Sequence, residues 1–366
     1  MQAINVALVT NVPAPYRIPV WRNLAESGSI DPTVIFCAQP QIDTKTAPTD
    51  YGFNYYFLTG KFIDKGRQFI HADLNIWSKL NELKPDIVIT VGYIPTYLFA
   101  FAWATFNGVP HIAMTDGTAQ SEQTLSWLHR FLRRIVLKRS TSFVGACEGS
   151  LDLFKHYGAP EDRLHKSYLC ADNAAFNQPT APNPVDFIFC GRFLSFKRPV
   201  FALEVAIATA KLLNRKTSID FVGSGELEAD MRAYATEIAE FVDARFLGYA
   251  TQAELPYRYA AAKIFLFPTE GDVWGVVANE ACASGLPVIV SPYAGVSGEL
   301  IIDGNNGFIR ELDVDLWATA AAQLLSDTTL YQSFSHNSRS QVAEYNFDNS
   351  AKGLTEAIIQ AFELSQ

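Results

Sequence analysis

Short apolar runs alternate with amphipathic stretches along the chain. In the first half, apolar runs predict strands at 4–10, 32–37, 86–92, 111–115 and 142–147. The amphipathic stretches between them predict helices at roughly 15–26, 72–83, 94–106 and 122–138. Continuously apolar strands separated by helices are typical of parallel sheets that are covered on both faces.

The alternation breaks once and then restarts. The stretch 173–185 holds three prolines and several Asn, Thr and Ala residues, which makes it the best linker candidate. Beyond it, apolar runs predict strands at 186–191, 218–223, 243–247, 263–268 and 287–291. The pattern predicts an α/β protein of two doubly wound, Rossmann-like domains, with ligands bound at the carboxyl ends of the strands in the cleft between the domains.

Composition supports a globular protein and argues against other classes. Apolar residues make up 49% of the chain and charged residues 18%, which is typical of a globular protein rather than a disordered one. The formal net charge of −9 argues against a general nucleic-acid binder. The five cysteines are scattered and never form C-x-x-C, so we interpret them as reduced, mostly buried thiols of a cytosolic protein.

Two segments bear on membrane insertion or export. Residues 1–12 contain no basic segment followed by a long apolar run, and they fit a strand better than a signal peptide. The most apolar stretch, 94–106, is shorter than a membrane span and is followed by Asn107 and Gly108, so a buried helix is predicted there. We therefore expect a cytoplasmic protein.

The most informative stretch, 264–308, leads from a strand through an acidic loop into a helix. The loop carries Asp272, and the helix begins near Gly275 and holds Glu280. Free N–H groups and the dipole at a helix start suit a phosphate or a polar sugar, and a glycine there lets a ligand approach the backbone closely. Asp272 is expected to face the same cleft, and Glu280 could accept two ribose hydroxyl groups. For isolated residues the alternative is a helix cap for Asp272 and a solvated charge for Glu280.

Two more loops follow strands of the second half. Arg192 and Lys197 come directly after the strand at 186–191, at a spacing that fits a diphosphate clamp. An ordinary basic loop that caps the next helix is the equally weighted alternative. Gly223 and Gly225 form a Gly-x-Gly turn after the next strand, a pattern that by itself only connects a strand to a helix.

Together these strings resemble the C-terminal domain of the family-4 retaining glycosyltransferases, of the bacterial polysaccharide and glycolipid type, which have the GT-B fold. The family's elements occur in order over residues 186–310, namely Gly191-Arg192 with Lys197, Gly223-Ser224-Gly225, Pro268-Thr269, the acidic-x7-Glu pair Asp272 and Glu280, Glu280-Ala281 through Ile289, Gly295 with Glu299, and Asp303-Gly304-Asn305-Asn306-Gly307. The segment Asn11 to Arg17 is similar to the first strand–helix loop of one bacterial branch. Two positions depart from the family pattern: Asp272 stands where Glu is usual, and Asp116 stands where a histidine is common.

The resemblance implies a role for each site residue. Arg192 and Lys197 would neutralise the donor diphosphate, with the Gly223 and Gly225 turn also at the donor. Glu280 would bind the ribose. Asp272 and the backbone at Gly275 and Val276 would face the transferred sugar. Asp116 could orient a sugar hydroxyl group, although a polar turn at the end of a strand is an equal alternative.

The resemblance also implies a domain plan. Residues 1–175 would form an acceptor-binding domain, residues 186–345 a nucleotide-sugar donor domain, and residues 346–366 a helix that crosses back to the first domain. The apolar positions of that last helix, Leu354, Ile358, Ile359 and Phe362, recur at helical spacing.

The implied reaction moves a sugar from a nucleotide-diphosphate sugar to a glycan or lipid-linked acceptor with retention of configuration. No metal or other cofactor is expected, because the two cations replace the metal of other transferases and the histidines lack metal-ligand spacing. Three alternatives remain: a nucleotide-sugar epimerase of the same fold, a two-domain binding protein, and a degenerate member that does not catalyse.

The segment 128–139 is basic and amphipathic in an otherwise acidic protein. Such a helix can lie on an anionic membrane, here the inner face of the plasma membrane. The alternative is a solvated helix whose apolar face joins the domain core.

Overall fold

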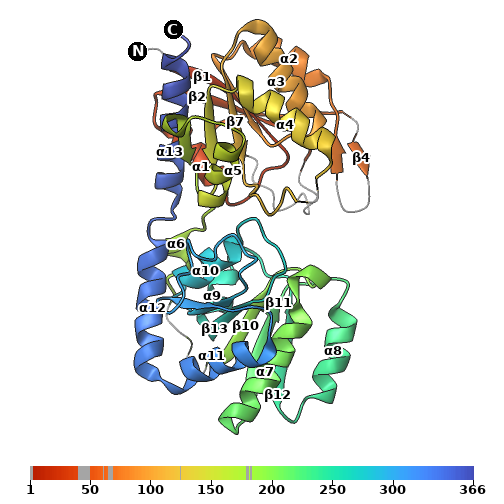
Figure 1. The fold of residues 1–366 in the computed structure, drawn as a ribbon, viewed down its shortest axis with the longest axis vertical. Helices are drawn as coiled ribbons and strands as arrows, with labels where there is room; N and C mark the ends of the chain where they lie inside the picture. Colours follow the sequence, from red (N-terminus) through yellow and green to blue (C-terminus); the bar gives the residue numbers. More distant parts are fainter. Residues whose placement is uncertain are drawn as a thin grey trace. The chain divides into compact units, whose positions relative to one another are not determined.

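The computed structural model describes residues 3–39, 50–60, 62–64, 69–123, 125–178, 181 and 184–366. The chain divides into two compact units: unit 1 consists of residues 1–169 with 347–366, and unit 2 of residues 170–346 (Figure 1). Residues 170–175, which the predicted boundary assigns to the first domain, lie in unit 2. The predicted linker contains a short helix, α6 (Asn173–Phe176), and its residues 179, 180, 182 and 183 lie outside the described ranges.

Within the described residues, unit 1 contains a parallel sheet with the strand order β3-β2-β1-β6-β7-β8-β9. Its strands are β1 (Ile4–Thr10), β2 (Ile30–Phe36), β3 (Asn54–Phe57), β6 (Ile87–Val91), β7 (His111–Thr115), β8 (Ser142–Gly145) and β9 (Leu164–Lys166). A separate antiparallel hairpin joins β4 (Phe62–Asp64) to β5 (Phe69–His71). The five strands predicted for this half are confirmed to within two residues at each end.

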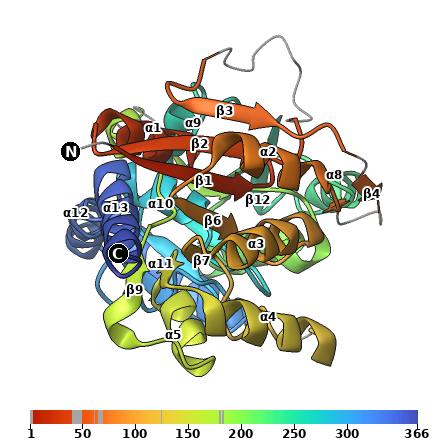
Figure 2. The ribbon, with the colours of Figure 1, turned by 90° about the horizontal axis from the view of Figure 1, so that it is seen from above.

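Helices cover both faces of this sheet. Alternate residues of each strand point to opposite sides, and the apolar residues on each side form a core with their own helices. Val6 and Leu8 of β1 share one core with the helices α1 (Ile18–Glu26) and α13 (Phe347–Glu363). Ala7 and Val9 share the other with α2 (Asn75–Leu83) and α3 (Pro95–Asn107). The remaining helices of this unit are α4 (Trp127–Arg139), α5 (Glu148–His156) and the short η1 (Glu161–Arg163). Figure 2 shows α4 beside α3.

The C-terminal helix α13 belongs to unit 1, as the fold prediction requires. Leu354 and Ile358 are fully buried against the sheet. Gly353 permits the close packing, because a Cβ there would lie 1.7 Å from the carbonyl oxygen of Lys166 on β9. Ile359 was expected on the apolar face but is 38% exposed, so the buried stripe of the helix is narrower than the sequence pattern indicated.

Within the described residues, unit 2 contains a second parallel sheet with the strand order β12-β11-β10-β13-β14-β15. Its strands are β10 (Val185–Cys190), β11 (Thr217–Val222), β12 (Val242–Gly248), β13 (Ala262–Phe267), β14 (Val288–Val290) and β15 (Gly307–Ile309). From β10 the chain adds β11 and β12 on one side of the sheet, and then β13, β14 and β15 on the other side. The point between β10 and β13 is the topological switch point, where doubly wound sheets bind ligands.

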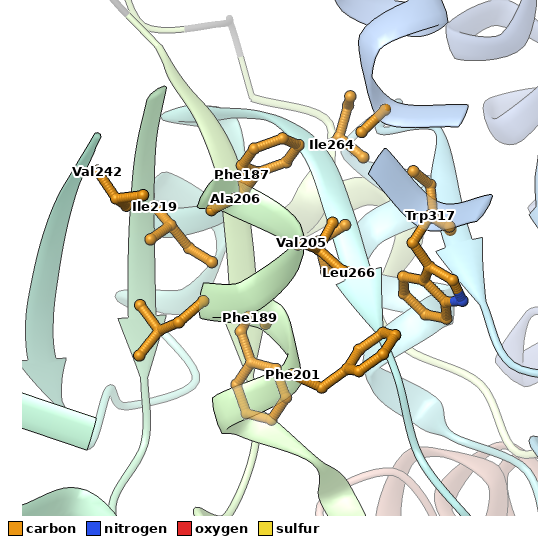
Figure 3. Close-up of a cluster of buried hydrophobic side chains, with 14 of the residues drawn as sticks. Phe187, Phe189, Phe201, Val205, Ala206, Ile219, Val242, Ile264, Leu266 and Trp317 are labelled. Carbon is orange, nitrogen blue, oxygen red and sulfur yellow. The ribbon is translucent and has the colours of Figure 1, made fainter. Parts of the chain in front are cut away.

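Helices also cover both faces of the second sheet. One face carries α7 (Pro199–Leu213), α8 (Glu228–Glu237) and α11 (Val314–Ser326), and the other carries α9 (Leu255–Ala260) and α10 (Val276–Ala283), with α12 (Thr328–Val342) packed on α10. Figure 3 shows the first of these cores, in which Phe187 and Phe189 of β10 lie among Phe201 and Val205 of α7 and Trp317 of α11. Unit 2 is therefore a complete α/β domain with its own core.

The apolar stretch at 94–106 is the buried helix that the sequence predicts, since α3 packs Ala100, Trp103 and Ala104 into the core of unit 1. None of the described helices combines the length and the apolarity needed to cross a bilayer. All five cysteines are free thiols, and four of them are buried.

Candidate functional site

The residues predicted to bind the donor diphosphate and sugar lie at the carboxyl edge of the unit 2 sheet, on either side of its switch point. The loop with Arg192 and Lys197 leaves the end of β10, and the loop with Asp272 leaves the end of β13. Since β10 and β13 pair in parallel, these two loops emerge next to each other. The structure thus brings together side chains that are 75 residues apart in the sequence.

Lys197 and Asp272 form an ion pair through Nζ and Oδ2, and their side chains are only 16% and 20% exposed. The backbone fixes this geometry. The N–H of Glu270 donates to the carbonyl oxygen of Phe196 at 2.7 Å, and the hydroxyl of the buried Thr269 lies 3.3 Å from the same oxygen. The loop before Asp272 is therefore fastened to the turn that carries Lys197.

The helix α10 begins without a side-chain cap. Gly275 lies immediately before the first residue of the helix. Its φ of 107° favours glycine, and a Cβ added at this position would lie 2.4 Å from the ring of Phe267. Asp272 instead exchanges backbone hydrogen bonds with Tyr293 and Gly295. The interpretation of Asp272 as a simple helix cap is therefore wrong, and the N–H groups at Val276 and the residues after it remain suited to an anion.

Glu280 lies inside the protein, contrary to the alternative of a solvated charge. It is 7% exposed, and its Oε2 accepts a hydrogen bond of 2.9 Å from the hydroxyl of Tyr259 on α9. Burial raises the pKa of Glu280 to about 7, an effect that the Tyr259 hydrogen bond partly offsets. Burial and the nearby Glu280 carboxyl both raise the pKa of Cys190, at the end of β10. The sequence contained no signal for Tyr259 as the partner.

Glu280 should make the stability of the protein depend on pH. Its folded pKa of about 7 exceeds its ordinary value of 4.5, so its stabilising contribution is complete below pH 4.5 and is lost as the pH rises to about 7. Between pH 4.5 and about 7, the free energy of unfolding of Glu280→Gln, measured in urea, should rise relative to that of the wild type by on the order of 3 kcal/mol. The exposed Glu226→Gln serves as the matched control. Parallel pH profiles for wild type and Glu280→Gln would refute the burial argument.

Arg192 differs from Lys197 in its surroundings. Its side chain is exposed, and it forms no ion pair with another residue in the described part of the chain. The neighbouring Arg198 pairs with Glu270 at 3.3 Å. Arg192 is thus available to an incoming anion, whereas Lys197 must exchange its partner. No cluster of three or more His, Cys, Asp or Glu side chains within the described ranges is arranged to hold a metal ion.

Gly223 and Gly225 let two loops touch. A Cβ at Gly223 would lie 2.0 Å from the carbonyl oxygen of Gly191, and a Cβ at Gly225 would lie 2.5 Å from that of Phe193. The N–H of Phe193 also donates to the carbonyl oxygen of Ser224 at 2.9 Å. The turn after β11 therefore supports the loop that carries Arg192, and its predicted place at the donor stays a prediction.

Replacing Gly223 by Ala should destabilise unit 2 by about 2–4 kcal/mol, because its φ of 134° is unfavourable for alanine and the new Cβ meets backbone atoms that cannot move away. Urea unfolding measures the difference. Gly298→Ala is the matched control, because Gly298 has a φ of 81° but open space around it, so only the backbone strain applies. Equal losses of stability in the two variants would show that the loop contact contributes nothing.

Asp116, the remaining predicted residue, lies in unit 1 after β7. Its Oδ1 accepts a hydrogen bond of 2.7 Å from Nη2 of Arg17, and Arg17 is only 4% exposed. Nη1 of Arg17 donates to the carbonyl and hydroxyl oxygens of Ser167. Asp116 is thus held by a buried guanidinium. The sequence indicates no role for Arg17 beyond its place in a family-like loop, and the signal that could have pointed to it is a cation in the loop between β1 and α1.

Comparison with known proteins finds that part of this chain is similar to glycosyltransferases. Residues 172–341 match the family model of group 1 glycosyl transferases. A D-inositol 3-phosphate glycosyltransferase of Corynebacterium urealyticum is 30% identical over 178 residues, which cover 46% of this chain and 41% of that protein. The chain thus spans less than half the length of that curated relative.

Solved structures also resemble this chain over nearly its whole length, and two of them illustrate the likeness. A glycosyltransferase from Rickettsia africae superposes with a TM-score of 0.75 at 15% identity, covering 99% of each chain. HepE of Anabaena, solved in complex with UDP, superposes with a TM-score of 0.75 at 14% identity, covering 97% of this chain and 98% of that one. The fold is therefore that of the GT-B glycosyltransferases, and the unit 2 segment 172–341, which holds the loops of Arg192, Lys197, Asp272 and Glu280, is similar to the group 1 glycosyl transferases.

Proposed function

We propose that this chain is a retaining glycosyltransferase that moves a sugar from a nucleotide-diphosphate sugar to a glycan or lipid-linked acceptor. The observation that carries the proposal is the Lys197–Asp272 ion pair beside an uncapped helix start at the switch point, with the exposed Arg192 on the same loop as Lys197. This set suits an anionic, hydroxyl-rich ligand. The match of the same segment to the group 1 glycosyl transferases, and the HepE structure with UDP, support this class of ligand.

In the proposed donor complex, Arg192 and Lys197 bind the diphosphate. Arg192 presents its exposed guanidinium, which can bind phosphate oxygens in pairs. Lys197 leaves Asp272 and contacts a phosphate oxygen instead. Two cations of this kind supply the charge neutralisation that a metal ion gives in other transferases, and we therefore propose a reaction that needs no metal.

The exchange of partners by Lys197 also frees Asp272 for the sugar. The ion pair holds the carboxylate at the start of α10 until the diphosphate arrives. Once Lys197 turns to the phosphate, Asp272 can accept a hydrogen bond from a hydroxyl group of the sugar, beside the N–H groups at Gly275 and Val276. Glu280 binds the ribose, and its pKa of about 7 means that this bond is strongest above neutral pH, where the carboxyl is ionised.

The proposed chemistry needs no protein nucleophile. The bond between the anomeric carbon and the leaving phosphate oxygen breaks, and the acceptor oxygen forms the new bond on the same face of the sugar. The proton of the acceptor hydroxyl passes to the leaving phosphate oxygen. The cations stabilise the negative charge that develops on the diphosphate, which is where preorganised charge accelerates such a reaction.

We assign the acceptor to unit 1. Asp116 is a candidate to bind a substrate hydroxyl group, because Arg17 occupies its Oδ1 and the side chain remains 28% exposed. Asp116→Asn keeps the shape of the side chain but loses the charge, so the proposal expects slower turnover with the donor affinity unchanged.

The experiment is to incubate the protein with UDP-, GDP- and ADP-sugars, with and without a panel of glycan and lipid-linked acceptors. The proposal expects nucleoside diphosphate release that depends on an acceptor and continues in the presence of EDTA, with a product whose anomeric configuration, read by NMR, matches that of the donor. An epimerase would convert the donor without any acceptor. A non-catalytic member would bind a nucleotide and release nothing, and either result would overturn the proposal.

A further inference from the structure

The helix α4 presents apolar and cationic side chains to solvent at once. Trp127 is 77% exposed, Phe131 52% and Leu128 47%, although large apolar side chains of this kind usually pack into a core. Of the helix's residues only Val136 and Leu137 are buried, so most of α4 does not serve the core of unit 1. The alternative, a solvated helix whose apolar face joins the domain core, is therefore wrong for the first half of α4.

The exposed residues share one side of the helix. Trp127, Phe131, Arg134 and Lys138 follow one another at intervals of four, three and four residues, the spacing of a single helical face. Arg130 lies beside them, one turn before Arg134. We call these five residues, together with Leu128, the α4 face. Aromatic side chains among cations are typical of a helix that lies at the level of lipid headgroups.

The charged residues of α4 itself are all basic. Residues 123–147 contain no Asp or Glu, while the chain as a whole carries a formal net charge of −9. The buried carboxyl group of Glu122 already has partners, since Arg133 forms an ion pair with its Oε1 and the hydroxyl of Tyr157 donates to its Oε2 at 2.6 Å. The basic face therefore keeps its charge for an external anion.

A hollow beside this face offers a place for that anion. It has a volume of about 280 Å³ and lies between α4 and α5. Arg130, Arg134 and His156 line it, together with Glu122, which is already paired with Arg133 and Tyr157. Three nitrogen-bearing side chains around a small hollow fit a phosphate group. Trp127 and Phe131 are on the same helix and can enter the headgroup layer next to it.

We propose that the α4 face docks unit 1 on a lipid bilayer that contains anionic phospholipids, with the hollow receiving a lipid phosphate. An anionic bilayer suits a row of cations with interspersed aromatic rings, because it offers continuous negative charge above an apolar layer. A protein or nucleic acid as occupant is an outcome of the test below. The docking is independent of the donor chemistry in unit 2.

Vesicle flotation tests this with the full chain and without donor or acceptor. Vesicles of phosphatidylcholine alone are compared with vesicles that contain about one third phosphatidylglycerol. We expect the protein to float with the anionic vesicles, to remain unbound with the neutral ones, and to be released by high salt. Arg134→Gln with Lys138→Gln should reduce binding about tenfold or more. Trp127→Ser with Phe131→Ser should also reduce binding at low salt by about tenfold or more, although this variant keeps every cation.

The matched control is Tyr249→Ser with Lys216→Gln, an exposed aromatic residue and an exposed cation of unit 2. It should float as wild type does, and circular dichroism should show all variants folded. Equal flotation with neutral vesicles, full binding by both α4 variants, or no binding to either vesicle would overturn the proposal. Self-association or nucleic-acid binding through the α4 face in place of flotation would do the same. Because no sugar transfer is measured, failure here leaves the proposed enzymatic function untouched.

Discussion

Asp272→Asn should lower kcat about 100- to 1,000-fold while leaving the donor KM unchanged or slightly lower. The carboxylate lies at the start of α10, next to where the transferred sugar is proposed to bind, so its interaction matters most as charge develops in the transition state. The ground state loses little, because in the free enzyme Asp272 holds Lys197 back from the diphosphate. Steady-state kinetics with a working donor and acceptor pair measures both constants.

Two further variants sharpen this result. Asp272→Glu restores the residue that is usual in the family that the sequence resembles, and in a site adapted to Asp the longer side chain should crowd the sugar and reduce activity or change donor preference. Glu270→Gln is the matched control, because it removes a carboxylate two residues away that is 49% exposed and pairs with Arg198. It should change kcat less than about threefold. Wild-type kinetics in Asp272→Asn would eliminate the assignment.

Lys197→Ala should weaken binding of the donor diphosphate by about 1.5–3 kcal/mol, or roughly 10- to 150-fold in Kd, because a charged hydrogen-bond donor is lost. The loss in kcat/KM should be larger. Without Lys197 the Asp272 carboxylate has no partner and repels the diphosphate, and the developing charge on the leaving group is no longer stabilised. Calorimetry with the nucleoside diphosphate measures its Kd separately from turnover.

The double variant Lys197→Ala with Asp272→Asn separates the two effects. It should bind the nucleoside diphosphate better than Lys197→Ala alone, because the unpaired carboxylate is gone, yet it should not recover turnover. Arg232→Ala removes an exposed cation of the same unit and should bind like wild type. If the double variant bound no better than the single one, the Lys197–Asp272 pair would have no part in donor binding.

The fold could be predicted from the sequence wherever strands are buried on both faces. β1 and β7 were predicted with their observed bounds, because INVALVT and HIAMT are largely apolar runs that are followed by polar or Gly/Pro-containing loops. β3 was missed because it lies at the edge of its sheet and three of its four residues are exposed. β9 and β15 have three residues each, too few for a period to be seen.

The sequence could predict which residues lie at the candidate site, but not which side chains pair with each other there. The order of the motifs placed Arg192, Lys197, Asp272 and Glu280 at one end of the sheet, because parallel strands end at the same edge. Local patterns could not show that Lys197 pairs with Asp272 or that Arg17 pairs with Asp116, since these partners lie 75 and 99 residues apart. The burial of Glu280 under Tyr259 depends on how α9 packs against α10, which a single sequence does not encode locally.

We propose above all that unit 2 binds a nucleoside diphosphate between the ends of β10 and β13. Isothermal titration of the wild-type protein and of Arg192→Ala with Lys197→Ala against UDP, GDP and ADP tests it most directly. We expect that at least one of these nucleotides binds the wild type and that the double variant, still folded, binds it at least about 100-fold more weakly. Unchanged affinity in the double variant, or no binding of any of the three by the wild type, would contradict it.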